Sequence, residues 1–103
     1  MTIAHIPTGT ITGFIAGALL VNTVPHTVKG VSGEKFPTPF AKPPGVGLSS
    51  PTTNVGWGAI NFAMGSALLL RRRGQTRDRI AVAAGGVATA FFLAHYFGRL
   101  NLD

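Results

Sequence analysis

Three long stretches of the 103-residue chain contain no charged side chain. They cover residues 7–28, 51–70 and 80–98, and each is close to the roughly 20 residues that a helix needs to cross a membrane. All nine lysines and arginines and all three acids lie outside these stretches. Because a charge at the centre of a spanning helix costs about 2.5–3.5 kcal/mol, this partition predicts an all-α protein with three transmembrane helices.

Residues at the ends of these stretches favour the same helices. Pro51 suits a first helical turn, and Ser50 before it can cap the free N–H groups through its hydroxyl. Gly30 is expected to close the first helix, and Pro25 to loosen its last turn. The alternative is two spans after an interfacial or cleaved first stretch. The first basic residue is Lys29, after that stretch, which disfavours a signal peptide.

We therefore expect one integral membrane domain over residues 1–103, with a Pro/Gly-rich extended outer loop at 29–50 and an Arg-rich loop at 71–79. The second loop contains Arg71, Arg72, Arg73, Arg77 and Arg79. Because basic residues gather in short cytoplasmic loops, these arginines should face the cytoplasm and contact lipid headgroups. Three spans then place the N-terminus inside and the C-terminus outside.

The composition of the chain argues against several classes of function. Only 12% of the residues are charged, against about 25% in soluble domains, and the net charge is +6. The arginines come with no RNA-binding, zinc-finger or recognition-helix pattern, so we expect no nucleic-acid partner. The chain has no cysteine, and no catalytic triad, phosphate loop or metal motif. The sequence thus predicts a protein that is not an enzyme, with no cofactor, no metal and no small-molecule substrate of its own.

Small residues recur at four-residue spacing in the first and third stretches. The two stripes are Gly9, Gly13 and Gly17, and Gly86, Ala90 and Ala94. In lipid, such stripes let helix backbones approach closely, so we predict that they form helix-packing interfaces. They can serve the chain's own bundle or dock on larger membrane protein subunits, and the small size of the chain favours docking.

Polar side chains within the stretches leave two further functions open. Asn22 and Asn61 can hydrogen-bond between helices, or can line a small self-assembling channel or transporter. His26 and His95 lie at similar depth by helical rise and could ligate a haem iron from opposite sides. No Cys, Asp or Glu is near enough in sequence to complete another metal site. Interfacial histidines bonded to backbone or water are the favoured interpretation.

The long loop carries two aromatic residues that bracket two prolines. Phe36 and Phe40 flank this stiff FPTPF segment, and few charges solvate the residues around it. Such a segment gains stability by lying on a surface. We expect it to dock on its own helices, on the lipid interface or on the exterior domain of a partner.

Residues 22–61, with the core PHTVKGVSGEKFPTPFAKPPGVGLSSPTTNVGWGAIN, resemble small multi-span bacterial membrane proteins that carry no assigned activity. The resemblance covers about 40 of the 103 residues and implies a location in the bacterial cytoplasmic membrane. It brings no functional residues with it. The function predicted from the sequence is a non-catalytic accessory subunit of a larger membrane complex, such as a lipid transporter or a respiratory assembly.

Overall fold

The computed structural model describes residues 6–71, 76–100 and 102 of the chain. Three helices make up most of it, α1 (Thr8–Val31), α2 (Pro51–Arg71) and α3 (Thr76–Arg99). The connection between α1 and α2 contains two short strands, β1 (Phe36–Pro37) and β2 (Leu48–Ser49). The predicted all-α class is confirmed, with one helix over each uncharged stretch.

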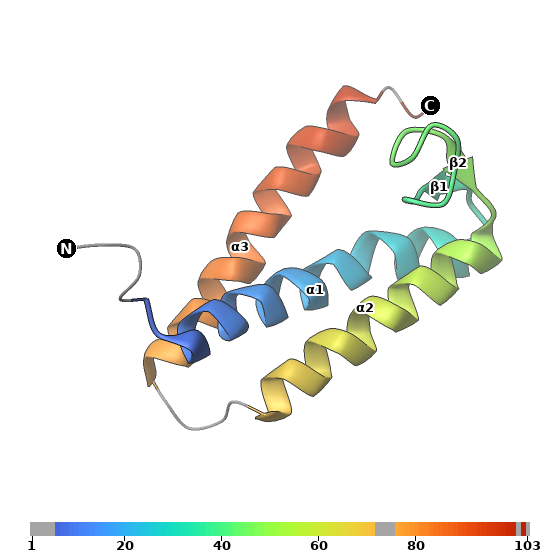
Figure 1. Ribbon diagram of the computed structural model, residues 1–103. Helices are drawn as coiled ribbons and strands as arrows, with labels where there is room; N and C mark the ends of the chain where they lie inside the picture. The colour runs from blue at the N-terminus through green and yellow to red at the C-terminus, as the bar shows by residue number, and fades with distance from the viewer. Residues whose placement is uncertain (1–5, 72–75, 101, 103) are drawn as a thin grey trace.

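α1 lies between the other two helices and packs against both (Figure 1). α2 runs back along α1, and α3 then runs in the same direction as α1 (Figure 1). The two strands pair antiparallel, with Phe36 opposite Ser49 and Pro37 opposite Leu48. We call residues 32–50, which include both strands, the cap. The cap therefore lies at the end of the bundle where α1 and α3 finish and α2 begins.

α1 ends later than expected, and with a different glycine. The helix continues through Pro25 to Val31. Gly30, which was expected to close the helix, lies inside it and is buried against α2. A Cβ on Gly30 would come within 2.7 Å of the Pro51 carbonyl oxygen. Ser32 is the C-cap residue, and Gly33 follows it with a φ of 75°, in the left-handed region that glycine adopts without a Cβ penalty.

α3 begins earlier than expected, so the loop predicted at 71–79 is shorter. α3 starts at Thr76, and Arg77 and Arg79 belong to its first turns. Asp78 is also in the first turn. An acid at that position interacts favourably with the helix dipole and so favours a helical start here, although arginines flank it.

The start of α2 is capped as predicted. Ser50 Oγ accepts a hydrogen bond from the Thr53 N–H at 3.1 Å. Pro51 is the first helical residue, where its missing N–H leaves nothing unsatisfied. The short polar segment before the second uncharged stretch therefore fixes where α2 begins.

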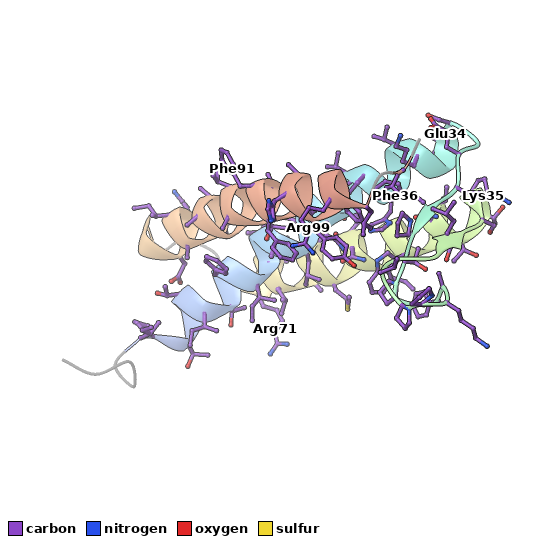
Figure 2. All side chains as sticks on the ribbon, turned by 90° about the horizontal axis from the view of Figure 1, so that it is seen from above. Glu34, Lys35, Phe36, Arg71, Phe91 and Arg99 are labelled. Carbon is purple, nitrogen blue, oxygen red and sulfur yellow. The ribbon has the colours of Figure 1, made fainter. Side chains whose placement is uncertain are left out.

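The interior of the bundle is small and polar, whereas its exterior is large and apolar. Among the described residues the buried hydrophobic side chains are Ala16, Phe36 and Ala81. The buried polar or charged ones are His26, Thr38, Asn54, Asn61 and Asp78. Phe91 points outward from α3 (Figure 2). Large apolar side chains are exposed on every helix, for example Ile11, Phe14, Ile15, Val24, Ile60, Phe62, Met64, Leu70, Ile80, Val87, Phe91 and Phe92. This distribution is the reverse of the one in water-soluble domains.

Two of the three helices are long and apolar enough to cross a membrane by length and composition. They are α1 and the part of α3 from Asp78 to Arg99. α2 is not among them, so the expectation of three such helices is met only in part. The reason lies in α2's own sequence, because Asn54 and Asn61 lower its mean hydropathy although both are buried.

Candidate functional site

α1 and α3 cross through a reciprocal pair of glycines. A Cβ on Gly17 of α1 would overlap the Val82 carbonyl oxygen of α3. A Cβ on Gly85 of α3 would overlap the Phe14 carbonyl oxygen of α1. Each glycine thus places its Cα against a carbonyl of the other helix, a contact typical of close helix pairs.

The predicted stripe on α1 lies inside this crossing. A Cβ on Gly13 would come within 2.7 Å of the Asp78 carbonyl oxygen, and a Cβ on Gly9 within 2.7 Å of the Asp78 carboxylate. Together with Gly17, these glycines are buried against α3 of the same chain. The stripe is therefore occupied by the chain's own bundle, which leaves it unavailable to another protein.

The predicted stripe on α3 is used only at one end. Gly86 is buried beside Val21 of α1, whereas Ala90 and Ala94 are exposed. α3 diverges from α1 beyond the crossing (Figure 1), so the rest of the stripe lines the open space between the two helices. The neighbouring small residues Ala81 and Gly85, which are both buried, form the actual contact.

α2 contacts α1 through a stripe of alternating polar and small residues. Its buried positions are Asn54, Gly58, Asn61 and Gly65, which recur at spacings of four, three and four. Asn61 Nδ2 donates to the Trp57 carbonyl at 2.8 Å, and its Oδ1 accepts from Asn22 Nδ2 at 3.1 Å. The two asparagines predicted to bond between helices therefore do so in this bundle.

The cap is tied to the bundle by a second buried amide, which the sequence analysis did not single out. Asn54 is 0% exposed, and its Nδ2 donates to the carbonyl oxygens of Phe36 (2.9 Å), Ser49 (3.3 Å) and Ser50 (3.1 Å). Asn54 Oδ1 lies 2.8 Å from His26 Nδ1. One side chain thus connects α1, α2 and both strands. The spacing between Asn54 and Asn61, which places both on one face of α2, was the signal in the sequence that could have revealed Asn54 as a buried residue.

Aromatic rings surround His26 at this end. The rings of Phe36, Trp57 and Phe97 lie edge-on to the imidazole, with centroid distances of 5.5, 6.5 and 6.1 Å. His95 is exposed on α3 and does not line the cavity beside His26. The two histidines that were considered as axial haem ligands are therefore placed in different surroundings.

The two phenylalanines predicted to dock the loop have opposite positions. Phe36, on the side of the cap that faces the bundle, is 6% exposed. Phe40 is 64% exposed and touches Trp57 only edge-on, at a centroid distance of 5.2 Å. The cap also receives a hydrogen bond from α3, because Tyr96 Oη donates to the Gly45 carbonyl at 2.6 Å. The cap is therefore anchored on its own helices, and Phe40 is the aromatic side chain left free for another surface.

Of the arginines predicted to contact lipid headgroups, those that the structure describes lie at the opposite end of the bundle. Arg71, labelled in Figure 2, ends α2 and is exposed, and Arg79 is exposed on α3. The backbone of Arg77 is in the first turn of α3. Arg72 and Arg73 lie outside the described residues. The arginines that can be placed are therefore separated from the cap by the length of the helices.

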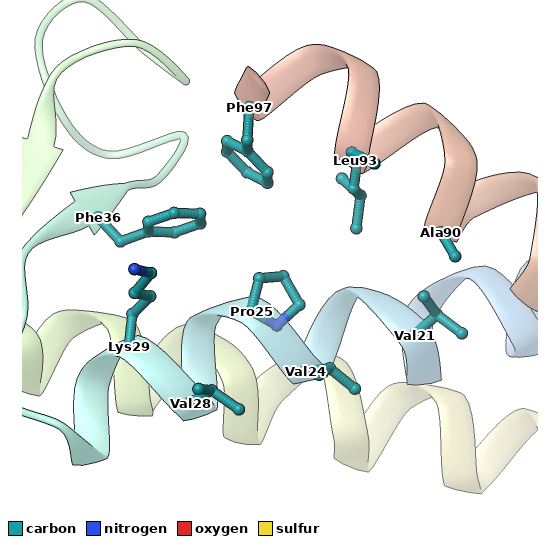
Figure 3. A pocket seen from close by; sticks show the side chains of 10 residues that line it. Val21, Val24, Pro25, Val28, Lys29, Phe36, Ala90, Leu93 and Phe97 are labelled. Atoms are coloured by element: carbon teal, nitrogen blue, oxygen red, sulfur yellow. The ribbon is translucent and has the colours of Figure 1, made fainter. Parts of the chain in front are cut away.

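An apolar groove of about 580 Å³ opens between the diverging halves of α1 and α3. We call it the α1–α3 groove, and it is lined by Val21, Val24, Pro25, Val28, Lys29, Phe36, Ala90, Leu93, Ala94 and Phe97. Figure 3 shows Phe36 and Phe97 at one end of this groove and Ala90 toward the other. Its walls are almost wholly hydrocarbon, so the groove can accept an apolar side chain but offers little to polar chemistry.

The described residues contain no cluster of three or more His, Cys, Asp or Glu side chains that could hold a metal ion. What the cap end offers is hydrogen-bonding side chains enclosed by aromatic rings, together with the neighbouring α1–α3 groove. Comparisons with protein-family models, curated proteins and solved structures find no match for this chain, so its function has to be inferred from its own geometry.

Proposed function

We propose that the protein is an integral protein of the bacterial cytoplasmic membrane that crosses the bilayer three times. The observation that supports this is the reversed distribution of side chains, with small and polar residues inside and large apolar residues outside. In water such a surface would expose many large apolar side chains, whereas in hydrocarbon it is the favoured arrangement. The buried amides bond to one another or to carbonyl groups, which a membrane interior requires.

α2 is included as the third span because of how its residues are distributed. Its polar and small positions, from Asn54 to Gly65, face α1, so they do not meet lipid. Its outward face carries Ile60, Phe62 and Leu70, all exposed. The mean hydropathy of α2 averages both faces, but only the outer face determines how the helix interacts with a bilayer.

The orientation follows from the basic residues. Arg71 and Arg79 lie at the end opposite the cap, and basic residues near short loops mark the cytoplasmic side. The cap, with Glu34 exposed at its start, then lies outside. The chain begins on the inner side and ends on the outer side.

Cysteine labelling tests this orientation, since the natural chain has no cysteine. In intact cells, Glu34→Cys should react with a membrane-impermeant maleimide, whereas Arg71→Cys should react only after the cells are permeabilised. Both positions are exposed, so poor access within the protein does not explain a difference. Labelling of Arg71→Cys alone in intact cells would reverse the orientation.

Within that membrane, we propose that the protein is a non-catalytic accessory subunit of a larger assembly. The α1–α3 groove carries this proposal, because Ala90 and Ala94 leave its wall low enough for the helix of another membrane subunit to approach closely. The exposed Phe40 provides a second contact, on the outer side. The host assembly could be a transporter, for instance of lipids, or a respiratory complex.

Filling the groove should release the protein from its partner. In mild detergent, the natural chain is expected to migrate on native gels with a larger complex, and Ala94→Trp is expected to shift most of it to the free form. Ala88→Trp is the matched control, because Ala88 is exposed on the same helix but does not line the groove. A natural chain that migrates alone, or two variants that behave alike, would count against the accessory role.

The two alternative functions receive less support from the geometry. A channel needs polar groups that face an open path, but Asn61 is 1% exposed, and its amide bonds to Asn22 and to the Trp57 carbonyl. A haem held by two histidines needs both rings at one site, but His95 is exposed and away from the His26 cavity. A discrete homo-oligomer in the native-gel experiment would favour the channel.

A further inference from the structure

One ring nitrogen of His26, Nε2, has no hydrogen-bond partner among the described residues. Asn54 Nδ2 faces the carbonyl oxygens of Phe36 and Ser50, which can only accept, so the amide orientation is determined by its neighbours. Asn54 Oδ1 therefore faces the imidazole, and His26 Nδ1 must carry the proton that it donates over 2.8 Å. In the neutral ring, Nε2 then keeps its lone pair and is a hydrogen-bond acceptor.

Asn22 presents a second acceptor for the same kind of reason. Asn61 Nδ2 donates to the Trp57 carbonyl, so Asn61 Oδ1 is the atom that accepts from Asn22 Nδ2. Asn22 Oδ1 makes no hydrogen bond with any described residue. Because Asn22 and His26 are four residues apart on α1, their side chains lie on one face with about 5–6 Å between Cβ atoms.

The two residues that carry these acceptors line one cavity at the cap end. This His26 cavity has a volume of about 230 Å³, and its walls include His26, Asn22, Thr38, Trp57, Tyr96 and Phe97. His26 is only 3% exposed. Among the described residues, every fully buried side-chain nitrogen or oxygen atom has a hydrogen-bond partner. His26 Nε2 has no hydrogen-bond partner among the described residues. It is therefore not fully buried, and it is exposed to open space beside the ring.

An apolar groove continues from the cavity along α1. We call it the tail groove; it has a volume of about 400 Å³ and shares Asn22, Phe92 and Leu93 with the His26 cavity. It extends to Phe14, eight residues before Asn22, which is about 12 Å along a helix. Cavity and groove together fall within the roughly 300–1,000 Å³ of ordinary ligand sites.

The walls exclude a charged occupant. Among the residues that the structure describes, no lysine, arginine, aspartate or glutamate lines the His26 cavity or the tail groove. A phosphate or ammonium group placed there would be desolvated without a partner, which is costly. Two acceptors call for a molecule that donates two hydrogen bonds, and hydroxyl groups do so without charge.

We propose that the His26 cavity and the tail groove bind one uncharged amphipathic lipid, with two hydroxyl groups on its head and a single apolar tail. One hydroxyl donates to His26 Nε2 and the other to Asn22 Oδ1, while the tail lies in the groove between Phe14 and Phe92. The head is either an aromatic diol, packed against the rings of Trp57 and Tyr96, or a glycerol. The site adjoins the α1–α3 groove and shares Leu93 and Phe97 with it, but His26 and Asn22 do not line that groove, so this inference does not depend on the accessory role.

Two diol probes and one methylated probe test the site directly. Dodecylresorcinol and glycerol monolaurate carry an aromatic and an aliphatic diol on similar tails, and the dimethyl ether of dodecylresorcinol cannot donate. Trp57, which lines the cavity, is the only tryptophan, so its emission reports binding to the protein in nanodiscs. We expect a saturable change with at least one diol, and binding of the ether weaker by about tenfold or more, since two hydrogen bonds are lost.

Variants assign the effect to His26. His26→Phe keeps a flat ring but removes both nitrogens and should weaken diol binding by about tenfold, whereas His95→Phe should leave it unchanged. Binding of dodecylresorcinol alone identifies an aromatic head, and binding of glycerol monolaurate identifies a glycerolipid; either supports the site. Equal binding of diol and ether, or a folded His26→Phe that binds as the natural chain does, overturns it. If His26→Phe does not fold, the comparison of diol with ether in the natural chain decides.

Discussion

Gly17→Ala is expected to push α1 and α3 apart and to destabilise the bundle by about 3 kcal/mol, the upper end of the usual range for overpacking. The added methyl group would overlap the Val82 carbonyl oxygen, which is backbone and cannot move aside as a flexible side chain can. The free energy of unfolding can be measured by titrating the protein from mild detergent into SDS and following its helical circular dichroism. Gly85→Ala should have a similar effect, through the Phe14 carbonyl.

The double variant separates this crossing from general damage. Because both substitutions widen the same contact, Gly17→Ala and Gly85→Ala together should cost clearly less than the sum of the two. Gly56→Ala is the control, since a Cβ there meets nothing within 4 Å. It should be neutral or stabilising by up to about 1 kcal/mol, as alanine favours helix over glycine. If Gly17→Ala proves as harmless as Gly56→Ala, the close crossing is wrong.

Asn54→Leu is expected to detach the cap and to lower the free energy of unfolding by at least about 3 kcal/mol. The leucine removes the donor to three carbonyl groups and the acceptor for His26, and each buried group left unpaired costs about 1–3 kcal/mol. The SDS titration measures the loss of stability. Faster proteolysis within the cap should accompany it, because β1 and the end of β2 lose their shared anchor.

The control for this substitution lies two residues away. Thr52 is exposed on the first turn of α2, so Thr52→Leu makes a comparable polar-to-apolar change without touching the buried amide. It should leave both the unfolding curve and the cleavage rate of the cap close to those of the natural chain. Equal effects of Thr52→Leu and Asn54→Leu would mean that Asn54 does not anchor the cap.

The sequence was most informative about elements whose signal is local. The absence of charge over three stretches was enough to predict three helices, because a helix satisfies its own backbone within one stretch of chain. Ser50 was identified as the N-cap residue of α2 from its immediate neighbours in the sequence. The end of α1 was less predictable, since Gly30 and Gly33 are both candidates and only packing against α2 distinguishes them.

What separates Phe36 from Phe40 is not local. Both are phenylalanines beside proline in the same short segment, yet Phe36 is buried and Phe40 is exposed. Their fates depend on where the bundle end offers space, beside His26 and Phe97, and no pattern within the segment encodes that. The composition of the segment was therefore enough to predict that the loop would dock. Only the assembled helices determine that Phe36 is the side chain that docks on them.

By itself, the amino-acid order determined that this chain is helical, where its helices lie and that glycine lets α1 approach a neighbour. The tertiary structure alone decided that Gly85, and not Ala90 or Ala94, completes the crossing with α1, and that Asn54 pairs with His26 across 28 residues. The physical reason is that helical periodicity places residues on a face, whereas which faces meet depends on the fit of whole surfaces.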